Sequence, residues 1–174
     1  EGDLEYVRAL SDEFGYAVPP TATLAVARAR VSSPPIRAAL DTGDFDDAAR
    51  LLGRPFELAG RVQHGQKLGR QLDAPTANIA LHRIRSPLQG VYAVSVWGGG
   101  LEGAQGVANV GVRPTIGERL EATLEVHVLQ GSPDLYGERL TVRFRHKLRE
   151  EQKFPSLEAL KAGIKADKAN ASAW

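Results

Sequence analysis

Between Phe56 and His146 the sequence consists of short strand-like segments that no helical pattern interrupts. The candidate strands are residues 56–63, 76–80, 90–97, 104–110, 120–129 and 139–146. Glycine, proline and aspartate residues mark the turns between them. Several short strands without intervening helices are typical of an antiparallel barrel or sandwich, so this region constrains the fold more than any other.

The clearest candidate strand runs from Leu120 to Leu129, where apolar and polar residues alternate. A period of two places these two kinds of residue on opposite faces of a strand. The polar face carries a carboxylate, Glu125, and an imidazole, His127. Considered alone, this face is most simply a solvated barrel exterior.

Helical patterns are confined to the two ends of the chain. Apolar spacing over residues 3–14 predicts a helix, and residues 16–20 are expected to form a short strand that ends at two prolines. Ser32 is expected to cap a helix through residues 36–40, and Asp44 to cap a second helix that ends before Gly53. Near the C-terminus, Ser156 should open a helix, and residues 167–174 are expected to fray.

Composition narrows the class of protein. The 174 residues, 43% hydrophobic and 25% charged, are typical of a globular chain with one core and an appendage. Without cysteine there are no disulfides or thiolate metal sites, and a cytoplasmic location is expected. The longest apolar run, Val91 to Val96, is too short to cross a bilayer. The chain has no methionine and starts at Glu1, so we expect a fragment, a processed chain or a trimmed product.

A basic face alone does not indicate nucleic-acid binding here. Arg139, Arg143 and Arg145 alternate with apolar residues on one candidate strand. Aromatic residues do not interleave with these arginines, and the formal net charge of the chain is only +1. A solvated strand face is therefore favoured, and neither a nucleic acid nor a membrane is expected as a partner.

A glycine-containing turn precedes the second candidate strand. Gly65 and Gly69 flank the tripeptide Gln-Lys-Leu, and such glycines let a ligand approach backbone N–H groups. Pro75 suits the first residue of a strand, whose period then places Thr76 and Asn78 on one face. A hydroxyl and an amide side by side suit a metal–phosphate group, because their oxygens can join the coordination of Mg²⁺.

The stretch from Gly60 to Asn78 resembles the riboflavin kinase family, whose pattern is close to Gly-x-Val-x-x-Gly-x-x-x-Gly-Arg-x-Leu-Gly-x-Pro-Thr-Ala-Asn. The Pro-Thr-Ala-Asn core, residues 75–78, is the specific part of this resemblance. The chain departs from the pattern at Asp73, where the family usually has glycine. Aspartate tolerates positive φ better than most residues, so the turn is expected to survive the difference.

Further family motifs follow in the same order. They are Gly-Val-Tyr at residues 90–92, the segment 106–115, Leu-Glu-Val-His at 124–127, and Lys-Leu-Arg-x-Glu-x-Lys-Phe at 147–154. From the resemblance we expect residues 109–115 to form a strand end and turn near the nucleotide or flavin. The segment 147–154 should be a loop that folds over the flavin.

The resemblance implies a mainly β fold, a six-stranded antiparallel Greek-key barrel with a C-terminal helix. It implies transfer of the γ-phosphate of ATP to the terminal ribityl hydroxyl of riboflavin, which gives FMN and ADP, with Mg²⁺ as cofactor. Glu125 is the implied catalytic residue, because a carboxylate can orient and deprotonate an alcohol. The residues implied at ATP and its phosphates are Gly65, Gly69, Arg70, Pro75, Thr76 and Asn78.

Two of these residues, Thr76 and Asn78, are the implied Mg²⁺ ligands. The residues implied at the flavin are Asn109, Arg113, Arg149 and Phe154. For Arg113 an ordinary surface position is equally favoured. Arg149 is also a candidate to neutralise phosphate charge, and Phe154 is favoured slightly as an anchor of the loop over a contact with the ring.

Residues 1–53 resemble the C-terminal end of the adenylyltransferase domain that precedes the kinase in bacterial bifunctional FAD synthetases. The resemblance lies in residues 32–37 and in Leu-Leu-Gly-Arg-Pro-Phe at 51–56. This gives two predicted domains, an α-rich remnant of an α/β nucleotidyltransferase at 1–53 and the kinase at 54–174. The family's His-x-Gly-His motif has no counterpart among the four histidines, so adenylyl transfer by this chain is not expected. For residues 32–37, helix capping is favoured over nucleotide binding.

Two other functions remain as alternatives. A barrel that binds a flavin or a nucleotide without turnover would show the same fold. A barrel that binds oligonucleotides would need a cationic groove with stacking aromatics, whereas aromatic residues make up only 6% of the chain. The oligomeric state is left open.

Overall fold

The computed structural model describes residues 4–19, 25–26, 29–63, 76–81, 86–114, 120–131 and 133–174. The chain divides into two compact units, Glu1–Val31 and Ser32–Trp174. Residues 32–53 belong to the same compact unit as the strands that follow, and the domain border between residues 53 and 54 stays a prediction.

The first unit contains helix α1, Leu4–Phe14, and the two-residue strands β1, Ala25–Val26, and β2, Ala29–Arg30, which pair antiparallel. The predicted first helix is confirmed. The predicted strand over residues 16–20 is wrong for residues 16–19, which adopt no regular structure. The Tyr16 hydroxyl instead donates to the carbonyl of Val7 at 3.5 Å.

The second unit opens with helices α2, Ser33–Thr42, and α3, Phe45–Leu52. Asp44 caps α3 as predicted, since its side chain accepts a hydrogen bond from the backbone N–H of Asp47 at 2.9 Å. Ser32 precedes α2 but its side chain makes no capping bond. A capping oxygen accepts from the second or third helical N–H, and Pro34 and Pro35 occupy those two positions without an N–H to donate.

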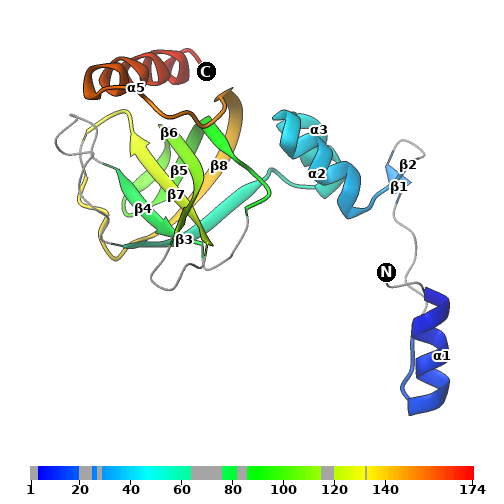
Figure 1. Cartoon of the computed structure of the whole chain (residues 1–174). Helices are drawn as coiled ribbons and strands as arrows, with labels where there is room; N and C mark the ends of the chain where they lie inside the picture. Colours follow the sequence, from blue (N-terminus) through cyan, green and yellow to red (C-terminus); the bar gives the residue numbers. More distant parts are fainter. Residues whose placement is uncertain are drawn as a thin grey trace. The chain divides into compact units, whose positions relative to one another are not determined.

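Six strands form a closed barrel, shown in Figure 1. They are β3 (Glu57–Gln63), β4 (Ala77–Ala80), β5 (Gly90–Gly98), β6 (Leu101–Pro114), β7 (Leu120–Val128) and β8 (Arg139–Arg149). The order around the barrel is β3-β4-β7-β6-β5-β8, and every pair is antiparallel. β5, β6 and β7 follow one another, and β8 returns beside β5, which is a Greek key. The predicted six-stranded Greek-key barrel is confirmed.

Alternating residues of the strands fill the barrel interior. Their exposed fractions are at most 3% at Val94, Val96, Ala108, Val110, Leu124, Val126, Leu140 and Val142. The alternation predicted for β7 is confirmed at every apolar position from Ala122 to Val128, all of which are buried. A barrel of this size has no internal room for a ligand, so Glu125 and His127 lie on its outer face.

Two predicted strand boundaries are wrong near the family motifs. Strand β6 continues to Pro114 and pairs with β7 over residues 109–114, so this segment is strand and not a turn. Strand β8 continues to Arg149, so residues 147–149 are strand and the loop begins at Glu150. Both errors have one cause, since pairing with a long neighbouring strand extends β structure beyond what local turn signals suggest.

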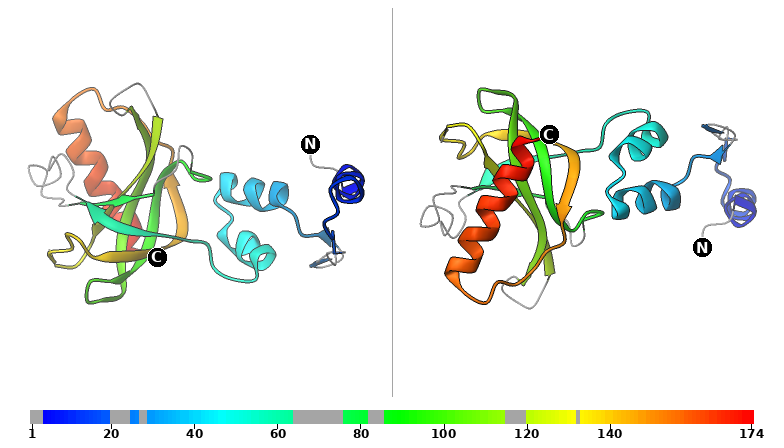
Figure 2. Two further views of the ribbon diagram at one scale, coloured as in Figure 1. Left: turned by 90° about the horizontal axis from the view of Figure 1, so that it is seen from below. Right: turned by 90° about the horizontal axis from the view of Figure 1, so that it is seen from above.

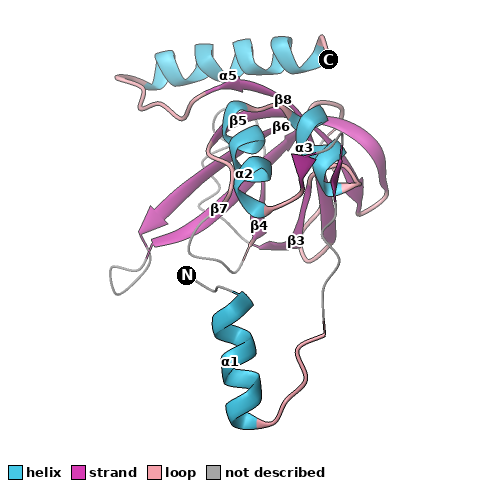
Figure 3. Cartoon of the chain, turned by 90° about the vertical axis from the view of Figure 1, so that its right-hand side faces the viewer, coloured by secondary structure: helices cyan, strands magenta, loops and turns pink. Residues whose placement is uncertain are grey.

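Helix α5, Leu157–Ser172, packs on the outside of the barrel against β5, β6 and β8 (Figures 2 and 3). Ser156 caps it, accepting from the N–H of Ala159 at 3.1 Å. The prediction that residues 167–174 fray is wrong: Asp167 and Ala171 are buried, and the ring of Trp174 stacks on His146 at 4.1 Å.

Four aromatic side chains join helix α3 to the barrel. Phe45, at the start of α3, lies 5.8 Å from the ring of Tyr92 and 5.9 Å from that of Phe144. Phe56 extends the cluster, with its ring 5.9 Å from Phe144. Such offset and edge-on pairs stabilise beyond their buried area, so α3 belongs energetically to the barrel.

Phe45→Ala should lower the free energy of unfolding of the second unit by about 3–5 kcal/mol, because it removes the ring by which α3 contacts Tyr92 and Phe144. Urea denaturation followed by circular dichroism measures the change. Leu157→Ala is the matched control, since Leu157 is 56% exposed and its loss should cost no more than about 0.5 kcal/mol. Equal effects of the two substitutions would show that the cluster does not hold α3.

Burial raises the pKa of the Tyr92 hydroxyl to about 12. Above pH 10, unfolded chains therefore lose this proton while folded chains keep it. The contribution to stability is complete below pH 10 and should fall by about 2–3 kcal/mol between pH 10 and 12. Urea midpoints measured across this range should fall less steeply for Tyr92→Phe, and parallel pH profiles would contradict the expectation.

Candidate functional site

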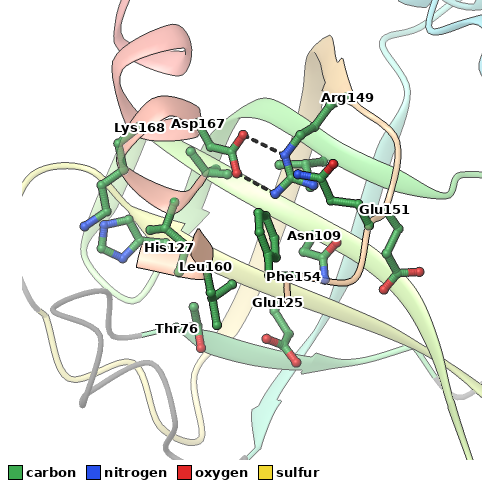
Figure 4. A pocket seen from close by; sticks show the side chains of 14 residues that line it. Thr76, Asn109, Glu125, His127, Arg149, Glu151, Phe154, Leu160, Asp167 and Lys168 are labelled. Carbon is green, nitrogen blue, oxygen red and sulfur yellow. Dashed lines mark hydrogen bonds and ion pairs between the residues drawn. The ribbon is translucent and has the colours of Figure 1, made fainter. Parts of the chain in front are cut away.

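A pocket of about 290 Å³ lies on the outer face of the barrel, between strands β5–β8, the loop after β8 and helix α5 (Figure 4). Its apolar wall is formed by Val91, Val107, Phe154, Leu160 and Ile164. Its polar side chains include Thr76, Asn109, Glu125, His127, Arg149 and Asp167. Segments separated by almost a hundred residues therefore meet in one cavity.

Strand register explains how these side chains meet. Arg149 on β8 lies opposite Val91 on β5, which lies opposite Asn109 on β6. Asn109 in turn lies opposite Glu125 on β7, and Glu125 lies opposite Asn78 on β4. Directly opposed residues of antiparallel strands share a face, with Cβ atoms about 5 Å apart. We call these five residues the cross-strand row.

The structure brings together five of the predicted site residues. Thr76, Asn109, Glu125, Arg149 and Phe154 all line the pocket. Two of them, Thr76 and Glu125, point toward the same part of it in Figure 4.

The other predicted residues are placed less completely. Asn78 is outside the pocket lining but adjacent to Glu125 in the cross-strand row. Arg113 lies in β6 opposite Glu121, and its side chain is outside the described part of the structure. Gly65, Gly69, Arg70 and Pro75 lie outside the described residues altogether.

Arg149 has a defined partner in the structure. Its Nε and Nη2 atoms donate to the two carboxylate oxygens of Asp167 at 2.9 and 2.8 Å, and Nη1 donates to the carbonyl of Glu150 at 3.0 Å. The Asp167 side chain is only 8% exposed, so this two-pronged ion pair is largely removed from water. The pair fastens α5 to the end of β8 and thereby fixes one wall of the pocket.

Phe154 anchors the loop that follows β8. Its ring lies 5.4 Å from the guanidinium carbon of Arg149. It also packs on Gly163 of α5, where an added Cβ would come within 2.6 Å of the ring. Because Phe154 also lines the pocket, the loop is held in place by a side chain that faces the site.

Sequence reasoning missed the contributions of α5 and of the loop. Glu151, Leu160, Ile164, Asp167 and Lys168 line the pocket and were not predicted as site residues. Leu160, Ile164, Asp167 and Ala171 are spaced by four, three and four positions, which places them on one helical face. That spacing is a usable signal in the sequence for the helical face that covers the pocket.

The described residues offer no cluster of three or more histidine, cysteine or carboxylate side chains that could hold a metal ion by itself. The neutral oxygens of Thr76 and Asn78 are hard ligands near Glu125, and they suit Mg²⁺ that arrives with phosphate groups. Separately, none of the described helices has the length and apolar character needed to cross a membrane.

Asp167→Asn should lower the free energy of unfolding by about 2 kcal/mol and weaken ligand binding to the pocket, since it leaves Arg149 without its counter-charge. Chemical denaturation and ligand titration measure the two effects. Glu150→Gln is the matched control: Glu150 pairs with Lys147 at 2.7 Å but is 75% exposed, so its loss should cost under about 1 kcal/mol. Indistinguishable variants would rule out a special role for the Arg149–Asp167 pair.

Comparison with known proteins identifies the family of this chain. The family model described as "Flavokinase: Riboflavin kinase" matches residues 52–174. A bifunctional riboflavin kinase/FMN adenylyltransferase of Pseudomonas fluorescens is 54% identical over 174 residues, which cover 99% of this chain and 55% of the relative. The protein of the same description from Escherichia coli (strain K12) is 44% identical over 171 residues, covering 98% and 54%. The chain thus spans about half the length of the curated relatives it matches.

Among solved structures, the crystal structure of a protein named macrolide-efflux protein, from Streptococcus pneumoniae, matches with a TM-score of 0.75 and 32% sequence identity. The match covers 96% of this chain and 55% of that one. The predicted family resemblance is confirmed by the family model, which covers more than half of the chain and the entire barrel with α5. The chain belongs to the riboflavin kinase family.

Proposed function

We propose that this chain is a riboflavin kinase, which transfers the γ-phosphate of ATP to the terminal ribityl hydroxyl of riboflavin and releases FMN and ADP. One observation carries the proposal. Glu125, Asn109 and Thr76 line a single pocket in a chain of the riboflavin kinase family, although they come from three separated segments.

Glu125 acts as the general base. An uncharged alcohol is a weak nucleophile, and a carboxylate within hydrogen-bond reach both orients it and accepts its proton. A bond forms between the ribityl oxygen and the γ-phosphorus, while the bond between that phosphorus and the bridging oxygen of ADP breaks. The proton of the alcohol passes to Glu125. The remaining contribution is positioning and charge stabilisation, as in other phosphoryl transfers.

Thr76 and Asn78 would hold Mg²⁺ together with the phosphates of ATP. Mg²⁺ generally keeps waters and takes few protein ligands, which fits one hydroxyl just before β4 and one amide within it. When bound, the ion neutralises phosphate charge. Gly65, Gly69, Arg70 and Pro75 complete the phosphate site in this proposal, with Gly65 and Gly69 allowing close approach of the backbone.

The apolar wall of the pocket receives the flavin ring. Val91 and Val107 form its floor on the barrel, and Phe154, Leu160 and Ile164 cover it from the loop and α5. The Arg149–Asp167 pair keeps these covering segments in place. A covered site also keeps water away from the transferring phosphoryl group.

Residues 1–53 are proposed to be the C-terminal end of an adenylyltransferase domain. The alignment with the Pseudomonas fluorescens relative, which extends over 99% of this chain, supports this assignment. The 174 residues contain no His-x-Gly-His motif, so we expect them to make FMN and no FAD. A cytoplasmic location is part of the same proposal.

Incubation with riboflavin, ATP and Mg²⁺, followed by chromatography of the flavins, tests the function. The parent chain should form FMN, and Glu125→Gln should lower kcat by about 10²–10⁴-fold, because the base is lost. Glu121→Gln is the matched control: it makes the same chemical change on the same strand at an exposed position outside the pocket. We expect it to retain activity within about twofold.

Each of three other outcomes would contradict one part of this proposal. Flavin binding without FMN formation by the parent chain would leave a binding module that does not catalyse transfer. Equal losses in Glu125→Gln and Glu121→Gln would remove Glu125 from the mechanism. FAD among the products would overturn the assignment of residues 1–53.

A further inference from the structure

Asn109 carries a polar atom that the described part of the chain leaves without a hydrogen bond. Its Oδ1 atom is buried, and none of the described residues offers it a hydrogen-bond donor. A buried acceptor without a partner is destabilising, so folded proteins rarely retain one without a use for it. Asn109 lines the pocket, which makes a bound ligand the natural source of the missing donor.

The neighbours of Asn109 in the cross-strand row limit what that ligand can present. On one side lies Val91, an apolar residue of the pocket wall, and on the other lies Glu125, the proposed base. Asn109 therefore lies between the apolar wall and the carboxylate. In riboflavin the part that joins the apolar ring to the reacting hydroxyl is the polyol chain.

We propose that Asn109 is a positioning residue, and that its Oδ1 accepts a hydrogen bond from a ribityl hydroxyl next to the one that Glu125 deprotonates. This inference rests on the proposed kinase function. Opposed Cβ atoms on adjacent strands lie about 5 Å apart, a span that a short stretch of the polyol chain bridges. One hydroxyl can then reach Asn109 while the terminal hydroxyl reaches Glu125.

The chemistry favours a hydroxyl of the chain over an N–H of the ring as the donor. Phe154, Leu160 and Ile164 give the ring a flat apolar contact area, and an N–H of the ring has other acceptors in the pocket lining, such as Glu151 and Gln152. A donor that reaches Asn109 must instead come close to the carboxylate of Glu125. Only the polyol chain of riboflavin has to approach that carboxylate for the reaction.

A consequence for specificity follows. A flexible polyol offers several hydroxyls to the base, and a second fixed point on the chain decides which one is presented. A hydrogen bond from the chain to Asn109 holds the polyol in one geometry, in which the terminal hydroxyl lies at Glu125. Flavins without side-chain hydroxyls should therefore gain nothing from Asn109.

Binding of riboflavin and of lumiflavin, which has the same ring but no ribityl chain, distinguishes the two parts of the substrate. Quenching of flavin fluorescence gives both dissociation constants. In Asn109→Leu the dissociation constant for riboflavin should rise about tenfold, because one buried hydrogen bond is lost, while that for lumiflavin should change by less than about twofold. The KM for riboflavin should rise in parallel.

Two further variants sharpen the comparison. Asn109→Asp keeps an acceptor oxygen, so it should retain the parent's preference for riboflavin over lumiflavin. Val107→Ala is the matched control, since Val107 lies two residues away on the same strand and lines the same pocket without a polar side-chain atom. It should weaken binding of both flavins by the same factor. If Asn109→Leu lacks the parent's circular dichroism spectrum, Asn109→Ala takes its place.

Equal losses for the two flavins in Asn109→Leu would overturn the inference and assign Asn109 to the ring. Loss of the riboflavin preference in Asn109→Asp would overturn it as well. These results differ from failure of the proposed function, which would appear as absence of FMN in the parent chain. With an active parent, the comparison of the two flavins decides the role of Asn109 alone.

Discussion

The pairing of β8 with both β3 and β5 is the constraint on which the rest of the structure depends, because it closes the barrel. The same strand then serves three other purposes along its length. Phe144 enters the aromatic cluster that holds α3, and Lys147 donates to the carbonyl of Asp41 at the end of α2 at 3.2 Å. Arg149, its last residue, binds Asp167 of α5. A change in the register of β8 would therefore displace both helical additions and the pocket.

Because the interior of a six-stranded barrel is filled by its own side chains, a site must be built on the outside. An outer face alone is open to water, and the loop after β8 together with α5 supplies the cover. The Arg149–Asp167 pair and the stacking of Trp174 on His146 join that cover to the barrel, and Phe154 packs on Gly163 within the cover. Two polar side chains of the pocket thus differ in whether the described part of the chain supplies their hydrogen bonds. Asp167 accepts two hydrogen bonds from Arg149, whereas Asn109 Oδ1 has no partner among the described residues.

Much of this could be predicted from the sequence. Alternation with a period of two is a local property, so the six strands, their inward faces and the position of Glu125 followed from it. The caps of α3 are also local, since Asp44 and Gly53 act within one helical turn. Family resemblance added the barrel topology and the grouping of Thr76, Asn109, Glu125, Arg149 and Phe154, which periodicity alone does not give.

The sequence by itself determined which residues form strands and which side of each strand is buried, because both depend on nearest neighbours along the chain. Only the tertiary structure decided where β6 and β8 end, that residues 167–174 form an ordered helix end, and that Arg149 is paired. Each of these depends on a partner distant in sequence: β7 extends β6, and Arg149 fixes Asp167 in α5. Local propensities cannot show such partners, since the free energy that orders these segments comes from contacts that exist only after the barrel has closed.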